Sequence, residues 1–262
     1  MLAFLVSGYL VVVKAQEDPL QKVLNDYIFT QDAYNQSLTS FNLNKDSYIK
    51  NPTLSLKEEA RKSLFDFLTK RNEYIKNYLL LLKTRISTAT GLDDQEKQNV
   101  YNILDPETSF FTDRKAEYKP ELSLEEMLSK SEQENLRYTT TTQKVIYYVV
   151  TTVGLSDLRE IKNNEISIYN SLKEESGNLV ILGRADSRLF DRWFNDINTE
   201  LNNFSTLESK YIRLREKILN EDGFTLKGTY ENTIEFSQEL RSSLVKTTGY
   251  IEELEKTVSE KR

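Results

Sequence analysis

Carboxylates are the groups in this sequence with the widest scope for chemistry, because its 262 residues include no histidine and no cysteine. Without histidine, the commonest general base and metal ligand and every Ser-His-Asp triad are excluded. Without cysteine, thiolate metal sites, disulfides and cysteine nucleophiles are excluded. We therefore expect no catalytic residue, no metal and no cofactor. A hydrolase built on carboxylates alone stays open as a rival, and it requires two acids about 5–10 Å apart across a cleft.

One stretch of the sequence alternates carboxylates with arginines. Its members are Arg184, Asp186, Arg188, Asp191, Arg192 and Asp196. A calcium loop needs oxygen ligands at alternating positions and a glycine-assisted turn. Arginines four residues from acids instead offer surface ion pairs, each worth about 0.3–0.5 kcal/mol. We interpret the stretch as a solvated helix face rather than a metal site.

The overall composition indicates long helices and argues against nucleic-acid binding. The net charge is −6 and no basic stripe is present that would displace counterions from phosphates. Eight glycines and four prolines are few for this length, so uninterrupted helices are favoured over turn-rich sheets.

Apolar residues recur at alternating spacings of four and three residues over much of the chain. Two such seams are Leu20, Leu24, Tyr27, Gln31, Tyr34, Leu38 and Phe41, and Ile197, Leu201, Phe204, Glu208, Tyr211, Arg215 and Ile218. This spacing is typical of packed helices, and short turns make neighbouring helices antiparallel. The sequence predicts an all-α fold, an elongated antiparallel bundle of five or six long helices with coiled-coil-like seams. Packing in these seams explains most of the aromatic residues, whereas a sugar-binding platform would need several rings exposed on one side.

Local signals place the ends of these helices. Three capping boxes are expected, at Ser55–Glu58, Asp93–Glu96 and Ser123–Glu126. Gly91 is expected to end a helix at the C′ position, and Gly154 to mark a break.

Four stretches are expected to be poorly helical. They are 106–122, the "RYTTTTQ" segment, 174–187 and 220–228. We expect the end loops among them (106–122, 174–187 and 220–228) to be held about 40–50 Å apart by rigid helices.

The first fifteen residues read as an export signal. Leu2–Val13 would span about 18 Å as a helix, well short of a hydrocarbon layer of about 30 Å, and its length suits the apolar region of a signal peptide. Val13-Lys14-Ala15 supplies small residues for cleavage, although no charged region precedes the apolar run. A retained anchor and a buried first helix therefore stay open. We predict a signal peptide at 1–15, an N-terminal helical unit at 16–176 and a C-terminal hairpin at 177–262, packed as one bundle.

Three apolar segments are candidates for contact with a partner or a membrane. They contribute Phe110, Phe111, Tyr147, Tyr148, Leu179 and Ile181. Exposed aromatic and aliphatic anchors dominate interface energetics, but such segments also plug bundle ends. The six-residue run 145–150 is too short to cross a bilayer.

Several helix-start and core-face patterns occur in a fixed order. "LSLKEEARKSLFDFLTKRNEYIKNYLLLLKTRI" is followed by "TATGLDDQEKQ", "LSLEEMLSKSEQENLRY" and "TQKVIYYVV". Over roughly residues 54–153 this order resembles a group of exported long-helix proteins of ultrasmall, host-attached bacteria. The resemblance implies export and an all-helical fold, and it implies no catalytic residue and no ligand.

These observations lead to a functional hypothesis. We expect a secreted, periplasmic or cell-surface protein that is not an enzyme and that acts as a structural or binding module for a protein or cell-envelope partner. The alternative is a component of an α-helical pore-forming toxin, with 145–150 as the membrane-contacting segment. Otherwise membrane contact would come only from an uncleaved N-terminus. Homo-oligomers stay open, because seams can be filled within one chain or between chains.

Overall fold

The computed structural model describes residues 18–262, so the predicted signal peptide lies outside the described residues. No strand occurs in the described range. Its helices are α1 (Pro19–Lys50), α2 (Leu54–Thr88), α3 (Asp94–Glu117), α4 (Leu124–Arg137), the π-helical segment η1 (Tyr138–Thr142), α5 (Gln143–Ile181), α6 (Arg188–Ile218) and α7 (Gly223–Ser259). Because α4, η1 and α5 follow without a break, they count as one rod among six continuous helices. The predicted all-α class is confirmed.

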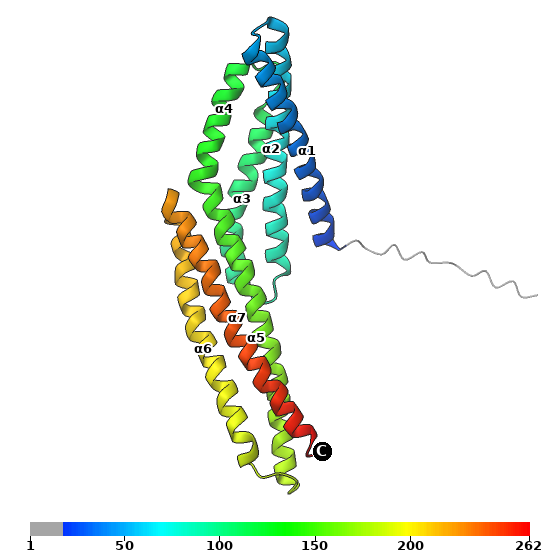
Figure 1. Ribbon diagram of the computed structural model, residues 1–262, viewed down its shortest axis with the longest axis vertical. Helices are drawn as coiled ribbons and strands as arrows, with labels where there is room; N and C mark the ends of the chain where they lie inside the picture. Colours follow the sequence, from blue (N-terminus) through cyan, green and yellow to red (C-terminus); the bar gives the residue numbers. More distant parts are fainter. Residues whose placement is uncertain (1–17) are drawn as a thin grey trace, which may run out of the picture.

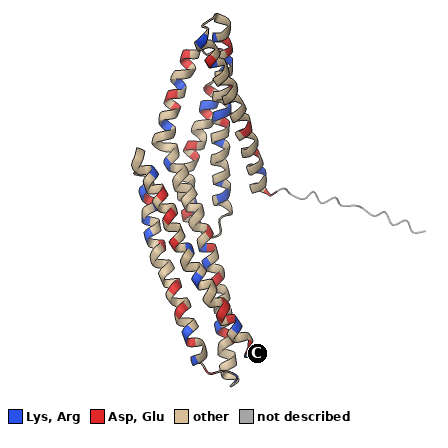
Figure 2. Cartoon of the chain, in the orientation of Figure 1, with Lys and Arg blue, Asp and Glu red and all other residues tan. Residues whose placement is uncertain are grey.

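The rod α4–η1–α5 is the spine of an elongated molecule. It runs from Leu124 to Ile181, which at 1.5 Å per residue is about 87 Å. Helices α1, α2 and α3 accompany its first part, and α6 and α7 accompany its second part (Figure 1). We call these the upper and lower halves. Acidic and basic residues alternate along both halves in the view of Figure 2.

A single core joins the two halves. Val145, Ile146 and Val149 of α5 pack in one cluster with Leu104 of α3 and Ile218 of α6. The helices of both halves therefore depend on the same buried segment of α5. The predicted boundary at 176/177 falls inside α5, whose contacts with the upper half extend past η1 to Ser156 and Arg159.

Two of the three expected capping boxes are present, at Asp93–Glu96 and Ser123–Glu126. The third prediction is wrong, because Thr53 rather than Ser55 caps α2. The Thr53 hydroxyl accepts a hydrogen bond from the Leu56 backbone N–H at 3.3 Å. The helix therefore begins as soon as Pro52 allows it.

The stretch 106–122 is mostly helical, against expectation. Helix α3 continues through Pro106 to Glu117. The missing N–H of Pro106 leaves the carbonyl of Asn102 without its helical partner, but both residues are exposed and water can satisfy that carbonyl. Burial of Leu104 and Phe111 on either side of the proline holds the helix together.

The other expected loops are also shorter than predicted. Helix α5 passes through Gly154 and ends only at Ile181, and α7 begins at Gly223. The connections are thus 182–187 and 219–222. Gly183, at φ 69°, supplies the left-handed residue that ends α5.

Gly91 has a different role from the predicted helix cap. Positive φ in the described glycines is confined to Gly183 and Gly223. The Gly91 N–H donates to Ser156 Oγ at 3.1 Å, and a Cβ at Gly91 would lie 2.2 Å from the Ser156 carbonyl oxygen. Glycine is therefore required because the turn after α2 touches the backbone of α5.

Replacing Gly91 should test this contact. We expect Gly91→Ala to lower the free energy of unfolding by about 1–3 kcal/mol, because the backbones must separate. Gly249→Ala is the matched control: its Cβ meets nothing within 4 Å in the interior of α7. We expect the free energy of unfolding of the control to rise by about 0.5–1 kcal/mol, because alanine is favoured over glycine inside a helix. Urea unfolding measures both, and a Gly91 variant as stable as wild type would contradict the assignment.

Glu165 provides a second test, of pH dependence. This carboxyl is 6% exposed; Oε1 accepts from Thr248 Oγ1 at 2.5 Å and Oε2 has no partner. Burial raises the pKa of this carboxyl above its value in the unfolded chain, against the opposing effect of the Thr248 hydrogen bond. The stability from this group is present at acid pH and is lost as pH rises through the folded pKa.

Glu165→Gln should therefore be stabilising near neutral pH, by about 1 kcal/mol or 2–4 °C in Tm. The gain should vanish below the ordinary glutamate pKa of about 4.3, where both versions are neutral. Thermal unfolding at the two pH values measures it. An equal gain in stability at both pH values, or a lower stability at neutral pH, would contradict burial as the cause of the raised Glu165 pKa.

Candidate functional site

A ladder of aromatic rings joins α1 to α2. Neighbouring ring centroids lie 5.2 to 5.8 Å apart. In order along the ladder the rings are Tyr78, Tyr27, Tyr74, Tyr34, Phe67 and Phe41. None of the six is fully buried, because α1 packs mainly on α2 and leaves one edge of the ladder uncovered.

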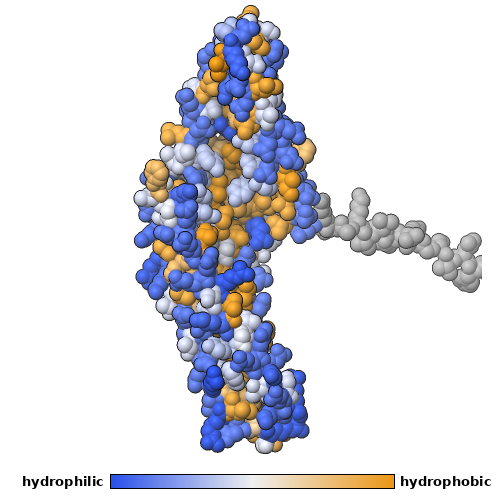
Figure 3. Space-filling model, viewed as in Figure 1, coloured by the Kyte–Doolittle hydropathy of each residue, from blue (hydrophilic) through white to orange (hydrophobic). Residues whose placement is uncertain are grey.

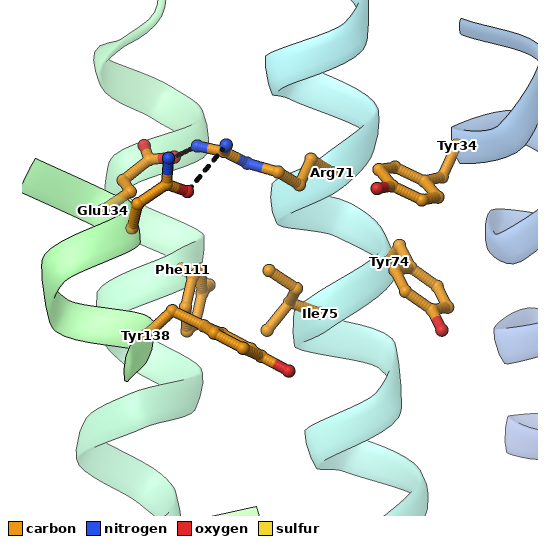
Figure 4. Close-up of a pocket in the computed structure, with 8 residues that line it drawn as sticks. Tyr34, Arg71, Tyr74, Ile75, Phe111, Glu134 and Tyr138 are labelled. Carbon is orange, nitrogen blue, oxygen red and sulfur yellow. Dashed lines mark hydrogen bonds and ion pairs between the residues drawn. The ribbon is translucent and has the colours of Figure 1, made fainter. Parts of the chain in front are cut away.

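A pocket of about 260 Å³ opens beside this ladder. Its lining comes from four α-helices and η1: Tyr34, Arg71, Tyr74, Ile75, Phe111, Glu134, Asn135 and Tyr138. Ile75 and Phe111 supply its aliphatic and buried aromatic surface (Figure 4). In the space-filling view, hydrophobic side chains gather in a hollow of the upper half (Figure 3). The pocket is thus an apolar recess with a polar rim.

The π-helical segment places one wall of the pocket. Tyr138, its first residue, extends its ring across the recess towards α2 (Figure 4). At the other end of the segment, Thr142 Oγ1 donates to Glu107 Oε2 at 2.7 Å, and Arg137, which directly precedes Tyr138, donates from Nη2 to Glu107 Oε1 at 2.5 Å. These bonds to α3 fix the segment from both sides. Single-turn π segments inside α-helices frequently occur at functional sites.

A buried ion pair closes one end of the pocket. Arg71 Nη2 on α2 donates to Glu134 Oε2 on α4, and Glu134 has a side chain only 2% exposed. Arg71 Nη1 also donates to Ser131 Oγ at 3.1 Å and to Asn135 Oδ1 at 3.2 Å. Glu134 additionally accepts from the side-chain amide of Asn72 at 3.3 Å. The acceptor atoms at this end are therefore already engaged.

The phenols of Tyr74 and Tyr138 in the pocket, and of Tyr78 in the ladder, have raised pKa values. Burial raises the pKa of Tyr74 to about 12, with a contribution from the Tyr27 hydroxyl 3.2 Å away. Burial likewise raises the pKa of Tyr78 and of Tyr138. At physiological pH these groups can donate and accept hydrogen bonds but do not act as bases.

The acids near the pocket and in the other clefts are held in ion pairs. Glu134 is the single acid in the lining of this pocket. In a separate cleft beside the turn after α2, Glu96 and Glu208 both pair with Arg159, at 2.8 and 2.5 Å. Within residues 18–262 no cluster of three or more His, Cys, Asp or Glu suited to a metal ion occurs.

The structure separates the six predicted contact residues. Phe111 contributes to the pocket, and Phe110 is half-buried, with the guanidiniums of Arg114 and Arg137 5.4 and 5.0 Å from its ring centroid. Ile181, at the far end of the lower half, is 83% exposed. The other three do not form a shared surface: Tyr148 and Leu179 are buried, and Tyr147 stacks on Tyr230 at 4.0 Å.

The segment assigned to the toxin alternative lies in the core. Val145, Ile146, Tyr148 and Val149 are all buried. Membrane contact by 145–150 would therefore require α5 to leave both halves of the bundle. A search of residues 18–262 finds no helix whose length and apolar character suffice to cross a membrane.

Most pocket residues were not singled out from the sequence. Tyr34 was placed in a seam, and Tyr138 lies in the "RYTTTTQ" segment noted as poorly helical. Nothing local distinguishes Arg71 and Glu134, which are 63 residues apart, from other charged helix residues. The one sequence signal that could have indicated the pocket is the run of four threonines at 139–142, which directly follows Tyr138 within a helix.

No protein-family model, curated protein or solved structure matches this chain. The resemblance over residues 54–153 therefore stays a prediction.

The Arg71–Glu134 pair should be essential to the upper half. We expect Glu134→Ala to lower the free energy of unfolding by about 3–5 kcal/mol, because Arg71 is left buried without its partner. The double variant Arg71→Met, Glu134→Leu should recover part of that loss, since it removes the Arg71 charge as well, while Arg114, 3.7 Å from Glu134, keeps its pairing with Glu117. Urea unfolding of the three proteins measures this. A double variant less stable than Glu134→Ala would contradict it.

Proposed function

We propose that this protein is an exported, non-enzymatic binding module that holds a segment of a partner protein in the pocket between α2 and the α4–η1 helix. The observation that carries the proposal is the apolar recess rimmed by Tyr34, Tyr74 and Tyr138, which no element of the described chain covers. Concave apolar sites with a few convergent polar groups are the usual form of binding sites.

The surroundings of the pocket favour specific binding over a chance gap in packing. Its polar end is fixed by the Arg71–Glu134 pair and its wall by the Glu107 contacts of η1. A wall held by buried charge-assisted hydrogen bonds is pre-organised, so little side-chain entropy is lost when a ligand binds. Tyrosine is also enriched at protein interfaces, where it offers contact area and a hydroxyl.

Export and the role of the rod are part of the same proposal. The apolar run at 2–13 supports export. The spine of about 87 Å supports a spacer role, because it separates the pocket in the upper half from the exposed Ile181 tip of the lower half. A cell-envelope component is a natural partner for either end of such a rod.

Selection from a random peptide library on the full chain tests the proposal. We expect recovered peptides to bind with saturable, micromolar affinity and to lose at least tenfold when Tyr138→Ala removes one pocket wall. Tyr250→Ala is the matched control, because this half-buried tyrosine lies in the lower half, 6.5 Å from Trp193. Peptides whose affinity is unchanged by Tyr138→Ala would contradict the assignment of the pocket.

A further inference from the structure

We infer that a second pocket, at the junction of the two halves, binds a small molecule that carries one carboxylate and an apolar body. This junction pocket has a volume of about 280 Å³, and its lining comes from α3 of the upper half, from α5 of the spine and from the end of α6 in the lower half. It shares no lining residue with the pocket between α2 and the α4–η1 helix. The inference is therefore independent of the proposed function.

The class of ligand follows from Arg215, a buried arginine whose pairing is incomplete. Arg215 lines the junction pocket, is 6% exposed and has its Cζ atom 5.0 Å from the ring centroid of Tyr148. Within residues 18–262 its one hydrogen-bond partner is Glu216, which accepts from Nη2 at 2.9 Å, whereas the buried Nε has no partner. A guanidinium carries five N–H donors. Because unpaired donors on a buried charge cost free energy, a ligand that supplies acceptors to Arg215 is favoured.

The two acids that line the junction pocket leave most of these donors free. Glu216 directly follows Arg215 in α6, and side chains one residue apart on a helix do not face each other, so Glu216 reaches only one edge of the guanidinium. Its Oε1 also accepts from the Tyr148 hydroxyl at 3.1 Å. Both oxygens of Glu96 accept from Arg159 Nη1, at 2.8 Å each. The pocket thus holds a guanidinium that can still pair with an acid from a ligand.

The charge of the lining favours a monocarboxylate over a phosphate. The two oxygens of a carboxylate fit the parallel N–H groups of an arginine fork. Arg215 is the single cationic residue in the lining, so a phosphate dianion would place a second negative charge beside Glu96 and Glu216 without a counter-ion. A carboxylate brings one negative charge, and the Glu216 side chain, which is 51% exposed, can turn into water when the ligand takes its place.

The rest of the lining selects the body of the ligand. Val100 and Ile103 of α3 line the junction pocket together with Leu219, the residue that ends α6. A volume of about 280 Å³ lies just below the range of about 300–1,000 Å³ that is typical of sites for drug-sized ligands. The ligand is therefore small and apolar apart from its carboxylate, and it contacts helices of both halves.

NMR of the full chain with labelled isoleucine methyls, titrated with benzoate, tests this inference. Ile103 lines the junction pocket, whereas Ile75 lines the other pocket and serves as the internal reference. We expect the Ile103 methyl to shift saturably with a Kd of about 1 mM and the Ile75 methyl to stay unmoved. Benzamide has the same ring and nearly the same size but no charge, and it should give no saturable shift at the same concentrations.

Three variants of α6 assign the shift to the guanidinium. Arg215→Met should weaken benzoate binding about tenfold or more, because the charge-assisted hydrogen bonds are lost. Arg213→Met is the matched control, since Arg213 is exposed two residues away on the same helix, and it should leave the affinity unchanged. Glu216→Gln should tighten binding about three- to tenfold, because it removes the negative charge that competes with the ligand. Circular dichroism verifies that each variant is folded.

A shift of Ile103 that benzoate causes, that benzamide does not cause and that Arg215→Met weakens supports the inference. An unmoved Ile103, an equal response to benzamide, or an unchanged affinity in Arg215→Met overturns it. If Arg215→Met does not fold, Glu216→Gln decides: tighter benzoate binding supports the inference, and unchanged or weaker binding overturns it.

Discussion

The continuity of the α4–η1–α5 rod is the constraint on which the rest of this structure depends. One helical rod must pack with α2 and α3 in its first part and with α6 and α7 in its second. In its middle, α5 contacts both halves at once: Arg159 pairs with Glu96 of α3 and with Glu208 of α6. The π segment at 138–142 interrupts the α-helical geometry of the rod before these contacts, and bonds to Glu107 hold it in place.

The upper half keeps a recess between its helices, and the π segment supplies one of its walls. Tyr138 projects towards α2 instead of continuing the α4 face, and α1 packs mainly on α2. In this half the aromatic ladder joins α1 to α2, and the Arg71–Glu134 pair joins α2 to α4. The uncovered edge of the ladder and the apolar recess beside it, with Tyr138 of the π segment as one wall, form the site that we assign to a partner.

The helices were largely predictable from the sequence, and the site was not. Spacing of apolar residues and two capping boxes located most elements, because these signals are local. Predictions failed where long-range packing prevailed: burial of Leu104 and Phe111 carried α3 through Pro106, and contact with Ser156 rather than a helix cap explains Gly91. The pocket was not predicted, because its ion pair joins residues 63 positions apart. Its tyrosines also cannot be told from ordinary seam positions in the sequence.

NMR of the full chain with labelled isoleucine methyls tests the central claim most directly. Ile75 lies in the pocket, whereas Ile161 on α5 and Ile181 at the lower tip are exposed elsewhere. Titration with a library-selected peptide should shift the Ile75 methyl in proportion to the bound fraction and leave Ile161 and Ile181 unmoved. Shifts at Ile181 or Ile161 with an unmoved Ile75 would show that the partner binds outside the pocket, contrary to this account.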